Sequence, residues 1–327
     1  MLPSLDAELG APGARLVSII IPARNEARSI AAVINAVQGA RPAGTGVEII
    51  VVDDGSTDDT VGVARAAGAR ILELGPNSDG GNPARARNRG AAIAQGDPIV
   101  FLDADCLPAA GWLARLLAAH DSGQQIVGGS LDLPPQLPAG ARCDYYCGWY
   151  HVHSGRRAGV VPNHPPGNLS VRRQVFAGSV GFTEQHPVAY AHEELAWQAE
   201  VRRLGVEIFF EPRAIVYHRN RPGMGNLLRR NYRWGYSAIE SKAQSGAARL
   251  AWIYRYPAVL VAASLPLAFG STAYILSCWV RVGVLEPLLM LPALLAARLA
   301  YSAGLVAGGL RWMRHRGVAP AMRPRWE

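Results

Sequence analysis

Short apolar runs alternate with helix-like stretches through the first hundred residues of the chain. The apolar runs have the length of strands, and their nearly continuous hydrophobicity is typical of strands covered on both faces. The stretches between them place apolar residues three or four positions apart, which is the spacing of one helix face. The expected strands are Val17–Ile21, Glu48–Val52, Arg70–Leu74 and Ile99–Leu102, and the expected helices are Glu26–Val37, Thr57–Ala67 and Ala84–Ala94. This alternation predicts an α/β fold with a mixed, mostly parallel sheet and helices on both faces.

Capping residues and prolines indicate where these elements begin and end. Ser56 or Thr57 is the expected N-cap of the second helix, because a short hydroxyl side chain can bond to the free N–H groups of a first turn. The segment Leu133–Ala141 contains three prolines and is expected to connect two subregions. Further along, Glu207–His218 is apolar on both sides of Pro212 and predicts two short strands.

Polar residues gather where three of the expected strands end. The segments Pro22–Glu26, Asp53–Ser56 and Asp103–Asp105 each follow an apolar run directly. The carboxyl ends of parallel strands meet at one edge of a sheet, where α/β proteins bind their ligands, so we expect these segments to share one crevice. The chain has neither a G-x-G-x-x-G nor a Walker A motif, so a phosphorylated ligand would need a metal ion or arginines to balance its charge.

Asp103 and Asp105 have the spacing of a metal site. In an extended segment, residues two positions apart face the same side, so both carboxylates can approach one divalent cation directly or through water. Mg²⁺ and Mn²⁺ prefer carboxylates, water and phosphate oxygens as ligands. A cation that bridges the two phosphates of a diphosphate would neutralise a leaving group.

The last third of the chain contains two long apolar runs. The first, 256–280, has no charged residue in 25 positions, which is long enough to cross a bilayer. The second, 287–310, contains Arg298, which is costly near the middle of a bilayer unless it is paired. We therefore expect a C-terminal apolar helical hairpin in a membrane, with the stronger signal in the first run. The alternatives are a buried hairpin of a soluble domain and a second helix that lies at the membrane interface.

The charge of the chain is divided unevenly between its two parts. The 327 residues carry a formal net charge of +8. Residues 1–218 hold 18 Arg against 22 acids, a net charge of −4, whereas residues 219–327 hold 14 Arg and one Lys against three acids, a net charge of +12. Because the arginines surround the apolar runs and no aromatic-interleaved motif accompanies them, nucleic acid is not an expected partner. The low share of charged residues excludes a disordered chain, and four cysteines are too few for a disulfide scaffold.

The flanking charges predict an orientation for the hairpin. Basic residues precede the first run and follow the second, while only Arg281 and Glu286 lie between the runs as charged residues. The excess of arginine at both ends places both termini in the cytoplasm. The first residues lack the basic and then apolar pattern of a signal peptide, so the first 218 residues are expected to stay cytoplasmic at the membrane.

Four blocks of sequence together resemble the family 2 glycosyltransferases, which have the GT-A fold. They are VSIIIPARNEARSI, IIVVDDGSTDDT, ARARNRGAAIAQGDPIVFLDAD and HEELAWQAEVRRLG, and they occur in the family's order over roughly Leu16 to Trp234. The resemblance implies a Rossmann-like GT-A domain at 16–235, preceded by a tail at 1–15. The remaining residues, 236–327, are then a juxtamembrane region and the transmembrane hairpin.

The resemblance also implies roles for individual residues. Donor-binding roles, on the base, ribose and diphosphate of the nucleotide sugar, fall to Pro22, Arg24, Asn25, Glu26, Asp53, Asp54, Arg87, Asn88 and Asp103. The metal ligands for Mg²⁺ or Mn²⁺ would be Asp103, Asp105 and His218. The acceptor or the diphosphate would be contacted by Asn168, Glu193, Arg230, Arg233 and Trp234. For His218 a structural role is the alternative, and for the arginines near Trp234 the alternative is attraction to anionic lipid.

Glu194 matches the general base of the family, and it departs from the usual residue. The family's motif has Asp at this position, and Glu is one methylene longer. A carboxylate of either kind can take a proton from an attacking hydroxyl. The alternative is a capping acid at a helix N-terminus, which the helix dipole favours.

The resemblance favours a membrane-anchored, metal-dependent, inverting glycosyltransferase. Its donor would be a nucleotide-diphosphate sugar, with UDP as the expected nucleotide, and its acceptor a hydroxyl of a lipid-linked molecule or glycan. A processive polysaccharide synthase is the second hypothesis, prompted by Arg230–Trp234. A catalytically silent, membrane-tethered nucleotide-binding module is the third, prompted by Glu194 and by the turn-rich segment Gly75–Pro83.

Overall fold

The computed structural model describes residues 15–75, 81–134, 137–184, 192–220, 222–245, 253–254 and 256–314, and for 243–245 the backbone alone. The chain divides into two compact units. The first comprises the described parts of 1–134, 152–184 and 201–219, and the second comprises those of 135–151, 185–200 and 220–327. The N-terminal tail and the middle of the segment Gly75–Pro83 lie outside the described residues.

The first unit contains the sheet and the helices that cover it. Its strands are β1 (Arg15–Ala23), β2 (Thr45–Asp53), β3 (Arg70–Glu73), β4 (Ile99–Leu102), β5 (Cys106–Pro108), β6 (Ile126–Asp132), β7 (Gly159–Val161), β8 (Asn168–Val171) and β9 (Ile208–His218). Its helices are α1 (Ile30–Gly39), α2 (Thr60–Ala66), α3 (Pro83–Ile93), α4 (Trp112–Asp121) and α6 (Arg173–Ala177). Helix α7 (Leu195–Arg203) begins in the second unit and ends in the first.

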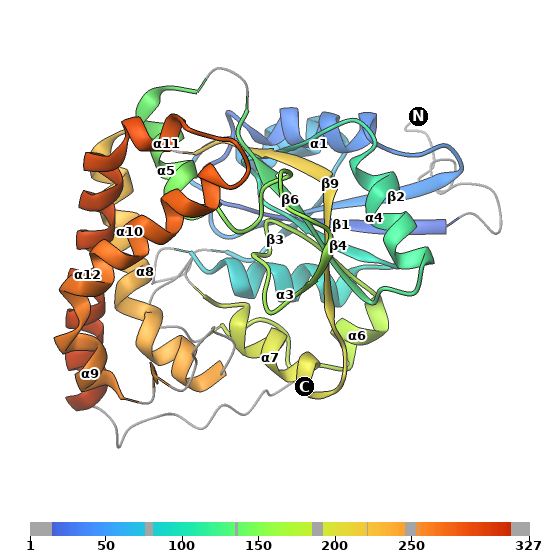
Figure 1. Ribbon diagram of the computed structural model, residues 1–327. Helices are drawn as coiled ribbons and strands as arrows, with labels where there is room; N and C mark the ends of the chain where they lie inside the picture. Colours follow the sequence, from blue (N-terminus) through green and yellow to red (C-terminus); the bar gives the residue numbers. More distant parts are fainter. Residues whose placement is uncertain are drawn as a thin grey trace. The chain divides into compact units, whose positions relative to one another are not determined.

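The strands form one mixed sheet in the order β3-β2-β1-β4-β8-β6-β9-β5, with β7 paired to β9. Strands β3, β2, β1 and β4 are parallel, β8 reverses direction between β4 and β6, and β6 and β9 are again parallel. Helix α3 packs on β1 and β2 from one face, and α1 covers the other face (Figure 1). The mixed sheet with helices on both faces confirms the predicted fold class.

The apolar runs predicted the first strands well because those strands are covered on both faces. Val17 and Ile19 to Ile21 of β1 have no exposed surface, and the four residues of β4 are at most 1% exposed.

The predicted N-cap of the second helix is wrong. Helix α2 begins at Thr60 with Asp59 as its N-cap. Ser56 and Thr57 bond instead to Asn25 in the loop after β1, so their hydrogen-bonding groups connect two loops.

The prediction of two strands around Pro212 is also wrong. Residues 208–218 form the single strand β9. The register with β6 shifts between Gly129 and Ser130, so three additional residues of β9 are accommodated as a bulge. Pro212 lies in this bulge, where the N–H that proline lacks is not needed for the ladder, and its carbonyl accepts a hydrogen bond from the Ser130 hydroxyl (2.9 Å).

The second unit is helical. Its helices are α5 (Ala139–Gly148), α8 (Met224–Ser245), α9 (Pro257–Ala262), α10 (Ser264–Val280), α11 (Glu286–Leu289) and α12 (Leu291–Arg314). Among the described residues, α12 is the one helix that is long and apolar enough to cross a membrane, as judged by length and composition. The sequence predicted the stronger membrane segment in the first apolar run, 256–280, but the helix long enough to cross a membrane lies in the second run. The first run is divided at Ala263 into α9 and a 17-residue α10, because Pro266 has no N–H for the carbonyl of residue 262.

Helices α8 and α12 pack with their backbones in close approach. Gly235 of α8 faces the carbonyl of Tyr301, and Gly304 and Gly308 of α12 face the carbonyls of Tyr232 and Tyr236. A Cβ atom at any of the three glycines would overlap with these backbone atoms. Small residues four apart that permit such contact are typical of helix pairs in membranes.

Replacement of Gly304 by Ala tests this packing. The added methyl group would meet the Tyr232 carbonyl, and backbone atoms cannot move away as a side chain can. We expect a lower melting temperature of the full chain in detergent, equivalent to about 1–3 kcal/mol. Gly270→Ala in α10 is the control, because no atom lies within 4 Å of a Cβ at that position. Equal melting temperatures for the two variants would contradict the proposed packing.

Two histidines of the first unit, His120 and His164, are buried. The Nδ1–H of His120 donates to the carbonyl of Gln124 (2.8 Å), and its Nε2 accepts from the Ser170 hydroxyl (2.7 Å). Burial lowers the pKa of His120 from 6.5 to about 4, and it does the same for His164. Above pH 6.5 the native and unfolded chains are both neutral at these positions. Between pH 6.5 and 4 only the unfolded chain takes up protons at these two positions. The free energy of unfolding therefore falls as the pH is lowered through this window.

We expect the free energy of unfolding to fall by about 2 kcal/mol for each of these histidines between pH 7.5 and pH 5.0. His120→Gln should unfold more easily at neutral pH but lose less stability on acidification than the wild type. Thermal unfolding of both proteins at the two pH values measures the difference. An identical pH dependence for wild type and variant would show that His120 does not stay neutral in the folded chain.

Candidate active site

The loops after β1 and β2 are joined by hydrogen bonds at the edge of the sheet. The backbone N–H of Asn25 donates to the Ser56 hydroxyl (2.9 Å), and the N–H of Thr57 donates to Asn25 Oδ1 (2.7 Å). Asn25 has a φ of 57°, a left-handed conformation that Asn tolerates better than most residues. Glu26, next to it, accepts from the Ser29 hydroxyl and donates its N–H to Thr60. The first predicted donor segment is thus a constrained loop, with Asn25 exposed and Arg24 half-buried.

Asp53 and Asp54 are buried side by side but have different surroundings. The Asp53 carboxylate accepts hydrogen bonds from the N–H groups of Gly55 and Ser56, which shapes the turn after β2. Asp54 Oδ2 accepts from the N–H of Asn82. Asp54 Oδ1 is buried without a hydrogen bond in the described part of the chain, and it lies 3.7 Å from Nη1 of Arg85. A buried carboxylate oxygen in this condition is suited to accept an N–H from a ligand.

Arg87 and Asp103 form an ion pair at the end of β4. Arg87 Nη2 is 2.7 Å from Asp103 Oδ1, and the arginine is only 4% exposed. The Arg87 guanidinium also lies over the ring of Phe182. Gly167 passes close to the other oxygen of Asp103, where a Cβ would be 2.7 Å from Oδ2. Asp103 is therefore oriented by Arg87 and by a glycine that leaves room for it.

Asp105 and His218 come together from two strands of the sheet. Asp105 precedes β5, His218 ends β9, and His218 Nε2 lies 3.7 Å from Asp105 Oδ1. One ligand atom each of Asp105, Cys106 and His218 lies within 4.8 Å of the others. A half-buried carboxylate and a buried imidazole at this separation fit a divalent cation such as Mn²⁺ or Mg²⁺.

Cys106 belongs to this cluster but is a poor ligand for such a cation. Burial raises the pKa of its thiol well above its usual range, and the neighbouring carboxylates of Asp105 and Asp103 raise it further. A protonated thiol does not coordinate Mg²⁺ or Mn²⁺, which prefer oxygen. The structure thus brings two of the three predicted metal ligands together, and it pairs the third, Asp103, with Arg87.

The side chains of two predicted site residues, Asn88 and Asn168, form hydrogen bonds within the fold. Asn88 bonds to the backbone N–H and carbonyl of Phe182 and to the side chain of Glu184, so its amide holds that segment. Asn168, which was expected at the acceptor site, is completely buried in β8. Its side chain donates to the carbonyls of Ser130 and Ala214 and accepts from the Trp112 indole. These bonds favour a role of Asn168 in holding strands together, and its expected contact with the acceptor stays a prediction.

Glu193 and Glu194 lie at the start of α7, in the second unit. Glu193 is 7% exposed, Glu194 is half-buried, and the Glu194 carbonyl accepts the first helical hydrogen bond from Gln198. His192, just before them, has a φ of 65° and bonds to the Ser237 hydroxyl. The helix dipole favours negative charge at this end, so the position suits a carboxylate.

The residues of the Arg230–Trp234 motif are placed differently from one another. Arg230 pairs with the buried Asp144 at 2.6 Å, and its guanidinium stacks on Trp234 at 4.5 Å. Asn220 also donates to Asp144 (2.7 Å). Arg233 is exposed. Arg230 thus serves to hold Trp234, whereas Arg233 is accessible to a ligand.

Sequence reasoning missed Asp144 and Cys106. Asp144 is the sole acid between Asp132 and Glu184, which was a usable signal because buried arginines need a carboxylate partner. Cys106 directly follows the D-x-D, but nothing in the sequence showed that β5 would pair it with His218.

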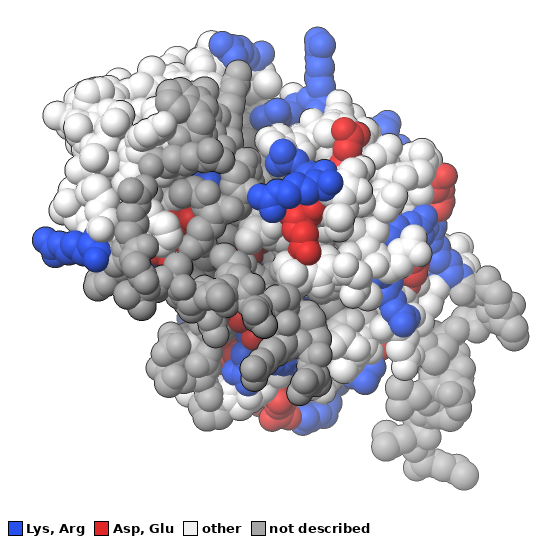
Figure 2. Space-filling model, turned by 90° about the horizontal axis from the view of Figure 1, so that it is seen from below, with Lys and Arg blue, Asp and Glu red and all other residues white. Residues whose placement is uncertain are grey.

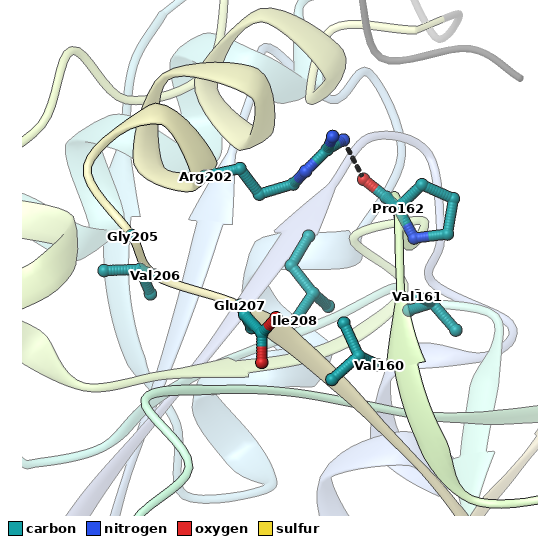
Figure 3. Close-up of a pocket in the computed structure, with 8 residues that line it drawn as sticks. All are labelled: Val160, Val161, Pro162, Arg202, Gly205, Val206, Glu207 and Ile208. Carbon is teal, nitrogen blue, oxygen red and sulfur yellow. Dashed lines mark hydrogen bonds between the residues drawn. The ribbon is translucent and has the colours of Figure 1, made fainter. Parts of the chain in front are cut away.

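A separate hollow lies at the open edge of the sheet in the first unit (Figure 3). It has a volume of about 460 Å³ and lies between β7 and the start of β9. Arg202 reaches across it and donates to the carbonyl of Pro162 (2.7 Å). None of the predicted site residues lines this hollow.

Comparison with known proteins decides the family. The family model for glycosyl transferase family 2 matches residues 18–176. The chain is 30% identical over 229 residues to the glycosyltransferase AglE of Haloferax volcanii, an alignment that covers 68% of this chain and 73% of AglE. The chain belongs to glycosyl transferase family 2. As a family 2 glycosyltransferase it uses a nucleotide sugar as its donor.

Solved structures show that this family 2 glycosyltransferase has the GT-A fold. It is similar to the mannosyltransferase PcManGT from Pyrobaculum calidifontis in complex with GDP-Man and Mn²⁺, with a TM-score of 0.59 and 19% identity over 91% of this chain and 86% of that one. It is also similar to glucosyl-3-phosphoglycerate synthase from Mycobacterium tuberculosis in complex with Mn²⁺, UDP-glucose and phosphoglyceric acid. There the TM-score is 0.50 and the identity 22%, over 72% of this chain and 82% of that one.

The metal-ligand assignment can be tested by direct binding. We expect Asp105→Asn and His218→Gln each to weaken Mn²⁺ binding in the presence of UDP at least about tenfold, because each removes a ligand. Isothermal titration of the full chain in detergent gives these affinities. Cys106→Ser is the control and should bind Mn²⁺ as the wild type does. A loss in Cys106→Ser as large as in Asp105→Asn would mean that the thiol is a ligand.

Proposed function

We propose that this glycosyltransferase is metal-dependent and inverting, and that it acts at the cytoplasmic face of a membrane. The proposal rests chiefly on one observation. The pair of Asp105 and His218 lies in the same unit as the Arg87–Asp103 pair, and Asp103 and Asp105 both lie in the short segment between β4 and β5. When bound there, a divalent cation would offset the negative charge that develops on the departing diphosphate.

Asp54 supports UDP as the nucleotide of the donor. Its buried Oδ1 has no hydrogen bond within the described residues, and an imide N–H of uracil is a suitable donor for it. Asp53 is already used by the turn after β2, so it would support the base site without contacting the base. The two similar structures hold GDP-Man and UDP-glucose, so the fold serves either nucleotide.

Glu194 is the proposed general base. Its carboxylate would take the proton of the acceptor hydroxyl while the oxygen attacks the anomeric carbon of the sugar. The new glycosidic bond forms as the bond from that carbon to the diphosphate breaks. Attack from the face opposite the leaving group inverts the configuration. Glu193 is buried next to Glu194 and would help to hold the start of α7.

Arg233 and Trp234 are the proposed contacts of the acceptor or the diphosphate. Arg233 is exposed, and Trp234 is held by Arg230, which also lies 5.8 Å from the centre of the Trp149 ring. Two indoles fixed in this way can support the apolar face of a sugar ring. Apolar helices α10 and α12 support a lipid-linked acceptor or a membrane glycan over a soluble one. Limited sugar addition is favoured over processive synthesis, because a translocating channel needs more membrane helices than these.

Two variants test the proposed roles together with a conservative control. Asp105→Ala and Glu194→Gln should each lower sugar transfer by about 10²–10⁴-fold while the chain still folds. Glu194→Asp restores the residue usual in the family and should keep much of the activity. Release of UDP and formation of the product from a panel of nucleotide sugars measure the rates. Full transfer by Glu194→Gln would exclude Glu194 as the base, and long polymeric products would favour the synthase hypothesis.

A further inference from the structure

Lys242 is the one lysine of a chain that otherwise uses arginine, and it lies inside the helical unit. It extends from α8 towards two tyrosines. Its Nζ is 3.4 Å from the Tyr301 hydroxyl and 5.3 Å from the centre of the Tyr254 ring. The ammonium group is therefore surrounded by aromatic rings and hydroxyl groups and is half-buried.

Arg298, in the first third of α12, reaches the same tyrosine. Its guanidinium lies 4.1 Å from the centre of the Tyr301 ring, and its Nε donates to the Ser271 hydroxyl of α10 (3.0 Å). Both cations also act electrostatically on Tyr150, whose ring meets that of Tyr274 edge-on at 5.8 Å. Helices α8, α10 and α12 thus converge on one polar cluster, which we call the Lys242–Arg298 cluster.

Among the described residues this cluster contains no carboxylate. Other cations of the unit have a carboxylate partner: Arg142 pairs with Glu286, Arg230 with Asp144 and Arg311 with Glu240. Within the described part of the chain neither Lys242 nor Arg298 forms an ion pair, although both are half-buried. Two half-buried cations that contact the same tyrosine without an acid favour an anionic ligand.

We propose that the Lys242–Arg298 cluster binds the phosphate group of an anionic lipid. Ammonium, guanidinium and tyrosine hydroxyl groups are the donors that a phosphate requires, and arginine with lysine provides both directional and point-charge contacts. The site is separate from the donor site, and it does not require that sugar transfer occurs as proposed.

The surface around the cluster supports a lipid as the source of that phosphate. Large apolar side chains of α9 to α12 are exposed, and they include Val259, Leu265, Leu267, Phe269, Leu289 and Leu299. The described part of the surface at the upper left of Figure 2, over these helices, shows few charged side chains. A ligand with an apolar tail and a phosphate head matches both features.

Native mass spectrometry of the full chain in neutral detergent tests this directly. With phosphatidic acid as the probe, we expect the wild type to bind it about tenfold or more tightly than phosphatidylcholine. Lys242→Gln and Arg298→Gln should each remove most of this preference. Arg281→Gln is the matched control, because it removes one exposed positive charge from the same unit. It should retain the preference.

Two further measurements separate the possible outcomes. Unchanged helix content and unchanged UDP binding by the variants show that a loss of lipid is not a loss of the fold. Calorimetry with glycerol 3-phosphate tells whether the cluster also accepts a phosphate without a lipid tail. Binding of that probe by the wild type and not by Lys242→Gln would support the phosphate site. The proposal is overturned if the wild type does not distinguish the two lipids, or if Arg281→Gln loses as much preference as Lys242→Gln.

Discussion

The parallel alignment of β1, β2 and β4 is the constraint on which the proposed donor site depends. In the observed register Ala23 is opposite Asp53, and Ile20 is opposite Phe101. Continuing the second pairing by two residues brings Asp103 level with Pro22. Polar segments far apart in the sequence therefore reach one edge of the sheet at nearly the same height. The hydrogen bonds between Asn25 and Thr57 and between Arg87 and Asp103 then fix individual side chains there.

The strands β1, β2 and β4 were predictable because strands covered on both faces appear in the sequence as continuous apolar runs. The end of each run also marks where a polar segment begins. Asp103, Asp105 and the residues from Pro22 to Glu26 could therefore be placed at strand ends from the sequence. Partners across the sheet could not be placed, because pairing between β5 and β9 joins segments more than a hundred residues apart. The hydrogen bonds of Asn168 to Trp112 and Ser130 also join distant segments, so its burial could not be predicted from the sequence.

The helical unit shows a different limit of sequence reasoning. Length and hydropathy predicted 256–280 as the stronger membrane segment, but a single proline divides it, and α12 is longer although it contains Arg298. The charge is tolerated because Ser271 and Tyr301 contact it. Glycines of α8 and α12 bring these helices close together, so the same packing that shapes the unit also brings Lys242 to Tyr301.

The central claim is that Asp105 and His218 hold one divalent cation together with the diphosphate of the donor. Pulsed electron paramagnetic resonance of Mn²⁺ bound to the full chain with UDP tests it most directly. The account predicts coupling of the same ion to an imidazole nitrogen and to phosphorus, and it predicts that His218→Gln loses the nitrogen coupling and keeps the phosphorus coupling. Phosphorus coupling without nitrogen in the wild type, or nitrogen coupling that persists in His218→Gln, would contradict it.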